Sequence, residues 1–354
     1  EIFKRVAALG HEVTLLCCKF KGAAGEETIN GIRIIRRGNR SLFNYYVPFA
    51  YKELTKKESF DVVIDDINKI PFYTPWFVKE PLLGLVHHFF GKSIFLQTSL
   101  LPASYVYFSE KLVPRIYRNI PFAAVSNSTK EEMRDVGING TIDLLPNAVD
   151  LDKYQVLEKT KSETPLIGYF GRLKKYKSVD HVLLAYKIVL EKVPNAKLVI
   201  VGDGDYRPNL EQLAKDEKIN DKIEFTGFVT HEQKVKLLNE MWLAVNPSPK
   251  EGWGLTVIEA NACGTPVIAS DSPGLRDSVS DGETGLLYPF GDTNKAAEQI
   301  IELINNNDKR DKFSSNAIKW AGNFNWDQSA QKAIQIIENC LFESEKKNAE
   351  TNNN

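Results

Sequence analysis

Two acidic residues, Glu251 and Glu259, flank the predicted start of a helix at Leu255. The free N–H groups and the positive dipole end of that helix would form an anion site, suited to a phosphate or to an electron-rich sugar oxygen. Gly252 and Gly254 lie just before it and allow the backbone to approach a ligand closely. Carboxylates accept hydrogen bonds from vicinal hydroxyls, so one acid could bind hydroxyls near a reacting carbon and the other a ribose diol. The alternative is that Glu251 caps the helix and Glu259 is a solvated side chain.

A second group of charged residues follows a predicted strand that ends at Phe170, and it reads Gly171-Arg172-Leu-Lys-Lys-Tyr-Lys177. A guanidinium and an ammonium at the carboxyl end of a strand could neutralise a diphosphate. Their charge would also offset the negative charge that develops as a nucleoside diphosphate departs. A run of Lys and Arg is otherwise commonly a solvated loop. The glycine that directs Arg172, and the anion-binding helix start in the same domain, favour the functional interpretation.

Short β-rich runs alternate with helical stretches along the whole chain, which is typical of α/β architecture. Strands are predicted at residues 12–17, 32–36, 61–65, 82–86, 122–126, 142–145, 166–170, 197–201, 222–226, 242–246 and 266–269. Helices are predicted at residues 1–10, 44–57, 128–135, 178–192, 208–218, 231–241 and 255–262. Ser128 to Glu131 and Thr230 to Gln233 have the spacing of capping boxes, which mark two of the helix starts.

The length of 354 residues predicts about two domains. The chain turns polar at residues 152–164, where we expect the linker. We therefore expect one Rossmann-like domain at residues 1–152 and a second at 164–325, a helix at 326–342 packed back on the first domain, and a disordered tail at 343–354. Two doubly wound domains of this kind would face a central cleft at the carboxyl ends of their strands. Because a helix opens the chain with no strand before it, we expect a first strand and loop to be missing.

Composition excludes several classes of protein. The formal net charge of −1 removes the electrostatic reason to expect nucleic acid as a partner. The four cysteines show neither a C-x-x-C pair nor the spacing of a disulfide framework, which fits a reducing compartment. No apolar run approaches the ~18 residues needed to cross a bilayer. Residues 1–150 carry 19 basic and 16 acidic residues, so peripheral contact of the first domain with an anionic membrane is left open.

Two further patterns are weak. Gly202 and Gly204 follow a predicted strand, but Arg207 stands where a dinucleotide fingerprint needs its third glycine. The adjacent Asp65 and Asp66 lack the further ligands that a divalent metal needs, so we interpret them as a capping or solvated pair.

Several spaced motifs together resemble the retaining glycosyltransferases of family 4, a glycogen-synthase-like group with the GT-B fold. They are the two acids with seven residues between them, Gly171-Arg172 with Lys177, Leu-Val-Ile-Val-Gly-Asp-Gly204, Ala-Val-Ser-Asn-Ser-Thr-Lys130, Leu-Pro-Asn-Ala-Val-Asp-Leu-Asp152 and Asn325-Trp-Asp327. The resemblance runs from residue 1 to about 345, and it is specific for the family but not for the substrate. Ala148 replaces a usual glycine, and Trp253 stands where phenylalanine is common.

The resemblance implies a role for each position. Glu251 would contact the hydroxyls of the donor sugar, Glu259 the nucleotide ribose, and Arg172 with Lys177 the diphosphate. The other nucleotide-binding positions would be the backbone of Gly252, Trp253, Gly254 and Leu255, together with Gly202 and, beside the base, Gly227, Phe228 and Val229. In the first domain His87 matches a histidine that the family places near the transferring sugar, with His88 as the fallback; a histidine that ends a buried strand is otherwise structural.

The expected activity is transfer of a hexose from a nucleoside-diphosphate sugar to a hydroxyl of a glycan, a lipid-linked or a small-molecule acceptor, with the anomeric configuration retained. The resemblance implies no metal and no cofactor beyond the nucleotide sugar, and we expect a cytoplasmic or membrane-peripheral protein. Two alternatives remain at this point. One is a nucleotide-sugar epimerase or phosphorylase on the same fold, and the other is an inactive nucleotide-binding partner. The nucleotide base, the sugar and the oligomeric state are left open.

Overall fold

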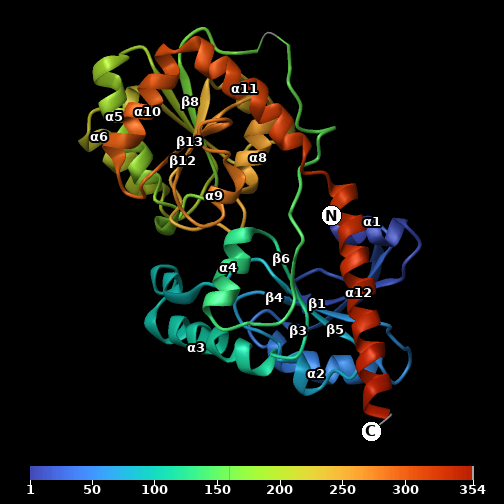
Figure 1. The fold of residues 1–354 in the computed structure, drawn as a ribbon. Helices are drawn as coiled ribbons and strands as arrows, with labels where there is room; N and C mark the ends of the chain where they lie inside the picture. Colours follow the sequence, from blue (N-terminus) through green and yellow to red (C-terminus); the bar gives the residue numbers. More distant parts are fainter. Residues whose placement is uncertain (159, 353–354) are drawn as a thin grey trace. The chain divides into compact units, whose positions relative to one another are not determined.

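The computed structural model describes residues 1–158 and 160–352. The chain forms two compact units, Glu1–Pro146 together with Trp326–Asn354, and Asn147–Asn325 (Figure 1). Each unit contains parallel β-sheet and helices, so the α/β prediction is confirmed.

The second unit is built on one six-stranded parallel sheet with the strand order β10-β9-β8-β11-β12-β13. Its strands are β8 (Leu166–Phe170), β9 (Lys197–Val201), β10 (Ile223–Gly227), β11 (Leu243–Asn246), β12 (Val267–Ser270) and β13 (Gly285–Tyr288). Its helices are α5 (Val179–Lys192), α6 (Arg207–Asp216), α7 (His231–Glu240), α8 (Leu255–Ala262), α9 (Leu275–Ser278), α10 (Thr293–Asn305) and α11 (Asn307–Gly322).

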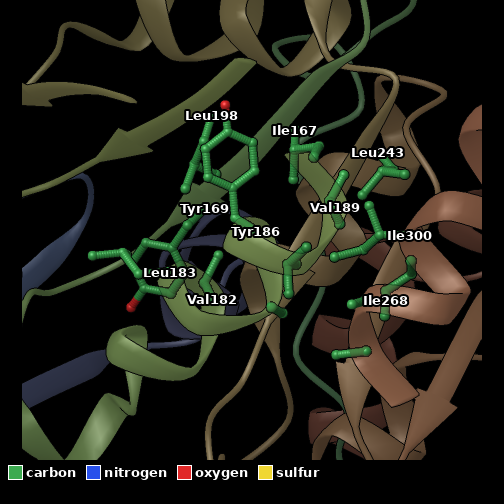
Figure 2. Packing of buried hydrophobic residues seen from close by; sticks show 14 of the residues in the cluster. Ile167, Tyr169, Val182, Leu183, Tyr186, Val189, Leu198, Leu243, Ile268 and Ile300 are labelled. Atoms are coloured by element: carbon green, nitrogen blue, oxygen red, sulfur yellow. The ribbon is translucent and has the colours of Figure 1, made fainter. Parts of the chain in front are cut away.

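Helices cover both faces of this sheet. Alternate residues of β8 and β9 enter different clusters, because successive side chains of a strand point to opposite faces. Ile167 and Tyr169 pack with α5, α6 and α10, whereas Phe170 packs with α7 and α8. Figure 2 shows the first cluster, in which Tyr186 of α5 lies among the β8 and β9 side chains. Burial on both faces explains why these strands are nearly continuous apolar runs.

The first unit contains two sheets. One has the order β1-β3-β2, with β1 parallel to β3 and β2 antiparallel, and the other is the parallel sheet β4-β5-β6-β7. Its strands are β1 (Val13–Lys19), β2 (Glu26–Ile29), β3 (Ile32–Asn39), β4 (Val63–Ile67), β5 (Leu82–Val86), β6 (Phe122–Ala124) and β7 (Ile142–Leu144). Its helices are α1 (Ile2–Ala8), α2 (Phe43–Leu54), α3 (Leu100–Ile116), α4 (Asn127–Asp135) and α12 (Trp326–Asn352), of which α1 packs against α12.

The capping boxes gave one correct and one wrong prediction. Thr230 caps α7 by accepting from the backbone N–H of Gln233, and the Gln233 side chain returns a bond to the Thr230 backbone. Helix α4, in contrast, begins at Asn127, because the Ser126 side chain accepts from the backbone N–H of Thr129. The expected cap at Ser128 therefore lies two residues too late.

The expected linker at 152–164 is part of the second unit, apart from Lys159, which lies outside the described residues. The backbone N–H of Leu157 donates to the side chain of Asn239 at 2.8 Å, and Trp242 donates through its ring N–H to the Ser162 carbonyl at 2.8 Å. Polar composition indicated a linker here, but backbone groups of a polar segment can also be held by side chains of a neighbouring helix.

The expected disordered tail is also corrected. Helix α12 continues to Asn352, and Asn353 and Asn354 lie outside the described residues. Residues 343–350 are mostly Glu, Lys and Ala, which are good helix formers. Glu343 and Lys347 also have the i, i+4 spacing of a pair that stabilises a helix. The polar residues of this segment therefore continue α12.

Candidate active site

Loops at the carboxyl ends of β8 and β9 pack backbone against backbone. A side chain at Gly202 would place its Cβ 2.0 Å from the carbonyl oxygen of Gly171, and one at Gly204 would lie 2.1 Å from that of Leu173. Gly202 also has a φ of 128°, where glycine is favoured. These glycines therefore let the loop after β9 lie directly against the loop that carries Arg172 and Lys177.

The ammonium of Lys177 and the carboxylate of Glu251 form an ion pair with Nζ and Oε1 2.5 Å apart. Their side chains are only 12% and 21% exposed, so water screens the pair weakly. Lys177 ends a short 3₁₀ turn, Lys175–Lys177, whereas Glu251 follows β11, 74 residues later. The structure thus joins the two charged motifs that the sequence analysis singled out separately.

Arg172 extends from the same loop as Lys177. Its side chain is exposed, and it forms no hydrogen bond or ion pair with residues 1–158 or 160–352. The Tyr169 hydroxyl donates to the Arg172 carbonyl at 3.3 Å. Burial raises the pKa of Tyr169, the Glu251 carboxylate adds to this rise, and the Arg172 guanidinium opposes it. The Tyr169 hydroxyl thus interacts electrostatically with both Glu251 and Arg172.

Helix α8 begins beside Glu251 with no side chain capping it. Its N-cap is Gly254, with a φ of 78°, and a Cβ there would lie 2.4 Å from Oγ of Ser278. The N–H of Val257 donates to the Gly254 carbonyl at 2.9 Å, so the N–H groups of Leu255 and Thr256 are the ones that an anion could bind. The ring of Trp253 is buried against Phe324, with ring centroids 4.8 Å apart, so only its backbone can face a ligand.

Glu259 is buried inside α8 and has two partners. Its Oε1 accepts from the Tyr154 hydroxyl at 2.7 Å, and its Oε2 pairs with the Lys234 ammonium at 2.6 Å. The solvated alternative for Glu259 is therefore wrong. Burial raises the pKa of Tyr154, and the carboxylate of Glu259 raises it further.

The predicted base-binding positions lie at the end of β10. The N–H of Gly202 donates to the carbonyl of Gly227 at 2.9 Å, which links this strand end to the loop after β9. Gly227 has a φ of 70°, and Phe228 after it is exposed, with no packing role for its ring in the core. Gly227 to Val229 therefore lie in the same loop cluster as Gly202 and Gly171.

His87 lies at the end of β5 in the first unit, apart from the other predicted site residues in sequence and in unit. Its Nε2 lies 3.3 Å from Oδ1 of Asp66, and the side chain is half-buried. The ring of His88 instead packs against Phe90, with centroids 4.6 Å apart. The partner of His87 is a carboxylate, which can orient its imidazole.

Asp65 and Asp66 cannot hold one metal ion together. They are neighbours in β4, so they point to opposite faces of the sheet. Asp65 is buried and accepts from the Thr74 hydroxyl at 2.6 Å and the Tyr117 hydroxyl at 2.7 Å, whereas Asp66 is exposed and faces His87. Over residues 1–158 and 160–352, no group of three or more His, Cys, Asp or Glu side chains could hold a metal ion.

Two family models match consecutive parts of the chain. The model described as Glycosyltransferase Family 4 matches residues 1–153, and the model described as Glycosyl transferases group 1 matches residues 152–320. The chain belongs to the family 4 glycosyltransferases. The resemblance inferred from the spaced motifs is confirmed.

Curated relatives of this family 4 glycosyltransferase include the D-inositol 3-phosphate glycosyltransferase of Nocardia farcinica, 28% identical over 62% of this chain and 53% of the relative. Another is the alpha-D-kanosaminyltransferase of Streptomyces kanamyceticus, 29% identical over 44% of this chain and 40% of the relative. The chain thus spans about half the length of the curated relatives it matches.

Solved structures with the same fold include sucrose-phosphate synthase from Thermosynechococcus elongatus. It has a TM-score of 0.81 and 23% identity, and the match covers 97% of this chain and 92% of the other. HepE from Anabaena, solved with UDP and glucose, has a TM-score of 0.73 and 17% identity over 93% of this chain and all of the other. The expected GT-B fold, with two Rossmann-like units, is confirmed for this family 4 glycosyltransferase.

Sequence reasoning missed three residues of the second unit. Tyr154 and Lys234 hold Glu259, and Gly274 lies under Glu251, where a Cβ would be 2.2 Å from the Glu251 carbonyl oxygen. Tyr154 and Lys234 had no local signal, because their partner is distant in sequence. Gly274 follows Pro273, and such a pair does signal a tight turn.

Proposed function

We propose that this family 4 glycosyltransferase transfers a hexose from a nucleoside-diphosphate sugar to an acceptor hydroxyl and retains the anomeric configuration. The observation that carries the proposal is the Lys177–Glu251 ion pair beside the uncapped start of α8. Cations and free N–H groups suit a diphosphate, and a carboxylate at the same point suits sugar hydroxyls.

Arg172, Lys177 and the first N–H groups of α8 would bind the diphosphate and stabilise the charge that it gains as the glycosidic bond breaks. Preorganised donors of this kind act where charge develops in the transition state, so they lower the barrier rather than only bind the donor. These positive groups supply the needed charge, so the proposed mechanism requires no metal.

Glu251 would hold hydroxyls of the donor sugar instead of attacking its anomeric carbon. Oε1 of Glu251 accepts from the Lys177 ammonium, and the same carboxylate would accept hydrogen bonds from hydroxyls of the sugar. The departing diphosphate oxygen would instead accept the proton of the acceptor hydroxyl on the face from which it leaves. Attack on that same face retains the configuration.

The nucleoside would bind along the same loop cluster. Glu259 would accept from the ribose hydroxyls, and the backbone of Gly227 to Val229 would lie beside the base, with Gly202 below it. Tyr154 and Lys234 support this assignment, because together they hold the Glu259 carboxylate in one orientation. His87 keeps the role that the family resemblance implies for it, and within the first unit its imidazole lies 3.3 Å from Asp66 Oδ1.

The experiment starts from UDP, GDP and ADP in a thermal-shift panel, followed by incubation of the matching sugar donors with acceptors. UDP-glucose is the first donor, since HepE was solved with UDP and glucose. Nuclear magnetic resonance of the product then reports its anomeric configuration, and Glu251→Ala is the inactive control.

Three outcomes would contradict the proposal. A product with inverted configuration would exclude the same-face mechanism. A changed donor sugar without consumption of acceptor would indicate an epimerase. Tight binding of a nucleoside diphosphate without transfer to a panel of glycan, lipid-linked and small-molecule acceptors would indicate an inactive binding partner.

A further inference from the structure

Helix α3 of the first unit exposes apolar side chains where a surface helix normally exposes polar ones. Its inner face is buried and includes Ala103, Val106 and Val113. Its outer face contains Leu101, Tyr105, Phe108 and Leu112, all exposed, and Leu101 is 84% exposed. These four residues are spaced 4, 3 and 4 apart, so they form one stripe along the helix. All four side chains of the stripe are therefore exposed to solvent.

Helix α2 extends this apolar surface. The hydroxyls of Tyr45 in α2 and Tyr105 in α3 lie 3.3 Å apart, so the two helices meet at this point. This contact and burial raise the pKa of Tyr105 to about 12, so its hydroxyl stays neutral at physiological pH. Tyr46 and Phe49 are exposed further along α2, and Phe49 is 75% exposed. We name the exposed residues Tyr45, Tyr46, Phe49, Leu101, Tyr105, Phe108 and Leu112 the α2–α3 face.

The charges on the α3 side of this face are positive. Residues 87–118 contain four basic residues, Lys92, Lys111, Arg115 and Arg118, and one acidic residue, Glu110. All four basic residues are exposed. Glu110 is buried, and its carboxylate accepts from the backbone N–H groups of Phe90 and Gly91 at 2.7 and 2.8 Å. The exposed Lys and Arg side chains therefore give the surface of this segment a positive charge.

We propose that the α2–α3 face docks this protein on the surface of an anionic lipid bilayer. Exposed Leu and Phe side chains can enter the boundary between headgroups and acyl chains, and Tyr rings are enriched at that depth because their hydroxyls stay at the polar level. Lys and Arg beside them attract anionic headgroups. No described helix is long and apolar enough to span a bilayer, so the contact proposed is with its surface.

Two other occupants fit this face less well. A soluble glycan stacks on aromatic rings, but it gives no role to the exposed Leu101 and Leu112. A second copy of the chain would bring two sets of like charges together, since Lys111 and Arg115 border the stripe on each copy. An anionic bilayer can bury the apolar stripe and can also pair its headgroups with the positive residues beside the stripe.

Co-sedimentation with lipid vesicles tests the proposal on the full chain and requires no catalytic activity. Vesicles of phosphatidylcholine alone are compared with vesicles that contain phosphatidylglycerol. One variant carries Leu101→Gln, Phe108→Gln and Leu112→Gln, and a second carries Lys111→Gln and Arg115→Gln. Glutamine is a good helix former, so α3 should persist in both, as circular dichroism will check. Phe342→Gln on α12, an exposed apolar position outside the face, is the matched control.

We expect the wild type and Phe342→Gln to bind the anionic vesicles, and each α3 variant to bind at least about tenfold more weakly. High salt should weaken wild-type binding. The proposal is overturned if the wild type stays in the supernatant with anionic vesicles, or if the folded α3 variants sediment as well as the wild type. If light scattering shows a dimer for the wild type and a monomer for the apolar-stripe variant, the face is assigned to a second copy of the chain. If the wild type binds a glycan array but not vesicles, the face is assigned to a glycan. Because the readout is sedimentation, loss of transferase activity alone leaves this test unaffected.

Discussion

The Lys177 ammonium lies 2.5 Å from the Glu251 carboxylate, and both residues belong to the second unit. The Lys177 ammonium, which is proposed to bind the diphosphate, is therefore neutralised by the Glu251 carboxylate, which is proposed to bind the sugar. A nucleoside diphosphate must share or replace this carboxylate as the partner of Lys177. Glu251 thus opposes the binding of the bare product, whereas an intact donor places sugar hydroxyls, which bind a carboxylate, at this point.

Glu251→Gln should therefore bind UDP, or whichever nucleoside diphosphate the thermal-shift panel selects, about tenfold more tightly. The same variant should transfer sugar more slowly, because the side chain at position 251 loses the negative charge with which it binds the sugar hydroxyls. Isothermal titration calorimetry measures the affinity, and Lys177→Met is the companion variant, expected to weaken it. Weaker nucleotide binding by Glu251→Gln would show that Glu251 does not compete for Lys177.

Arg172→Ala should lower the rate of transfer at least a hundredfold, which corresponds to about 3 kcal/mol of transition-state stabilisation. Its side chain is exposed and unpaired within the described residues, so the free energy of unfolding should stay unchanged. Lys175→Ala, an exposed lysine of the same loop, is the control and should keep nearly full activity. Near-normal turnover of Arg172→Ala would remove Arg172 from the proposed site.

His87→Ala should lower transfer about tenfold or more and leave the affinity for the nucleoside diphosphate unchanged. His87 belongs to the first unit, whereas every proposed nucleotide contact belongs to the second. His88→Ala is the matched control, since its ring packs on Phe90. If steady-state kinetics show the larger loss for His88→Ala, the assignment moves to that residue.

Glu259→Gln should weaken nucleotide binding and also lower the free energy of unfolding by on the order of 1–3 kcal/mol, because Lys234 loses its charged partner. Adding Lys234→Met should recover part of the stability but none of the affinity. A ribose contact predicts that the wild type prefers UDP to 2′,3′-dideoxy-UDP and that Glu259→Gln does not. Equal preference in both proteins would assign Glu259 to structure alone.

Asp65 should make stability depend on pH. Burial raises its pKa above the ordinary value of 3.8, although Thr74 and Tyr117 donate to it. The folded state therefore binds this proton more tightly than the unfolded state, so the contribution of Asp65 to stability is present at low pH and is lost as pH rises through its folded-state pKa. Relative to Asp65→Asn, the wild type should lose stability in urea titrations as the pH rises above the ordinary carboxyl pKa of 3.8. A pH-independent difference would contradict the raised pKa.

Local sequence patterns predicted many of the helices and strands. Continuous apolar runs placed β5, β8 and β9 to the residue, and α8 was also placed to the residue. Two strands were missed, β2 and β13. Strand β2 is largely exposed at a sheet edge, so it lacks an apolar pattern. Strand β13 has four residues, two of them only partly buried. The positions of the charged motifs after strands also indicated which residues to examine for a site.

The sequence by itself determined the family, the α/β class, and the identity of the acids and cations of the candidate site. These depend on residue type and on spacing over a few turns of chain, which local geometry translates directly into position. Only the tertiary structure decided which charges meet. Lys177 pairs with Glu251 across 74 residues, and Tyr154 reaches Glu259 across 105. Such partners are selected by how strands order themselves in the sheet and by which side chains the packed helices bury, and neither leaves a periodic signal in the chain.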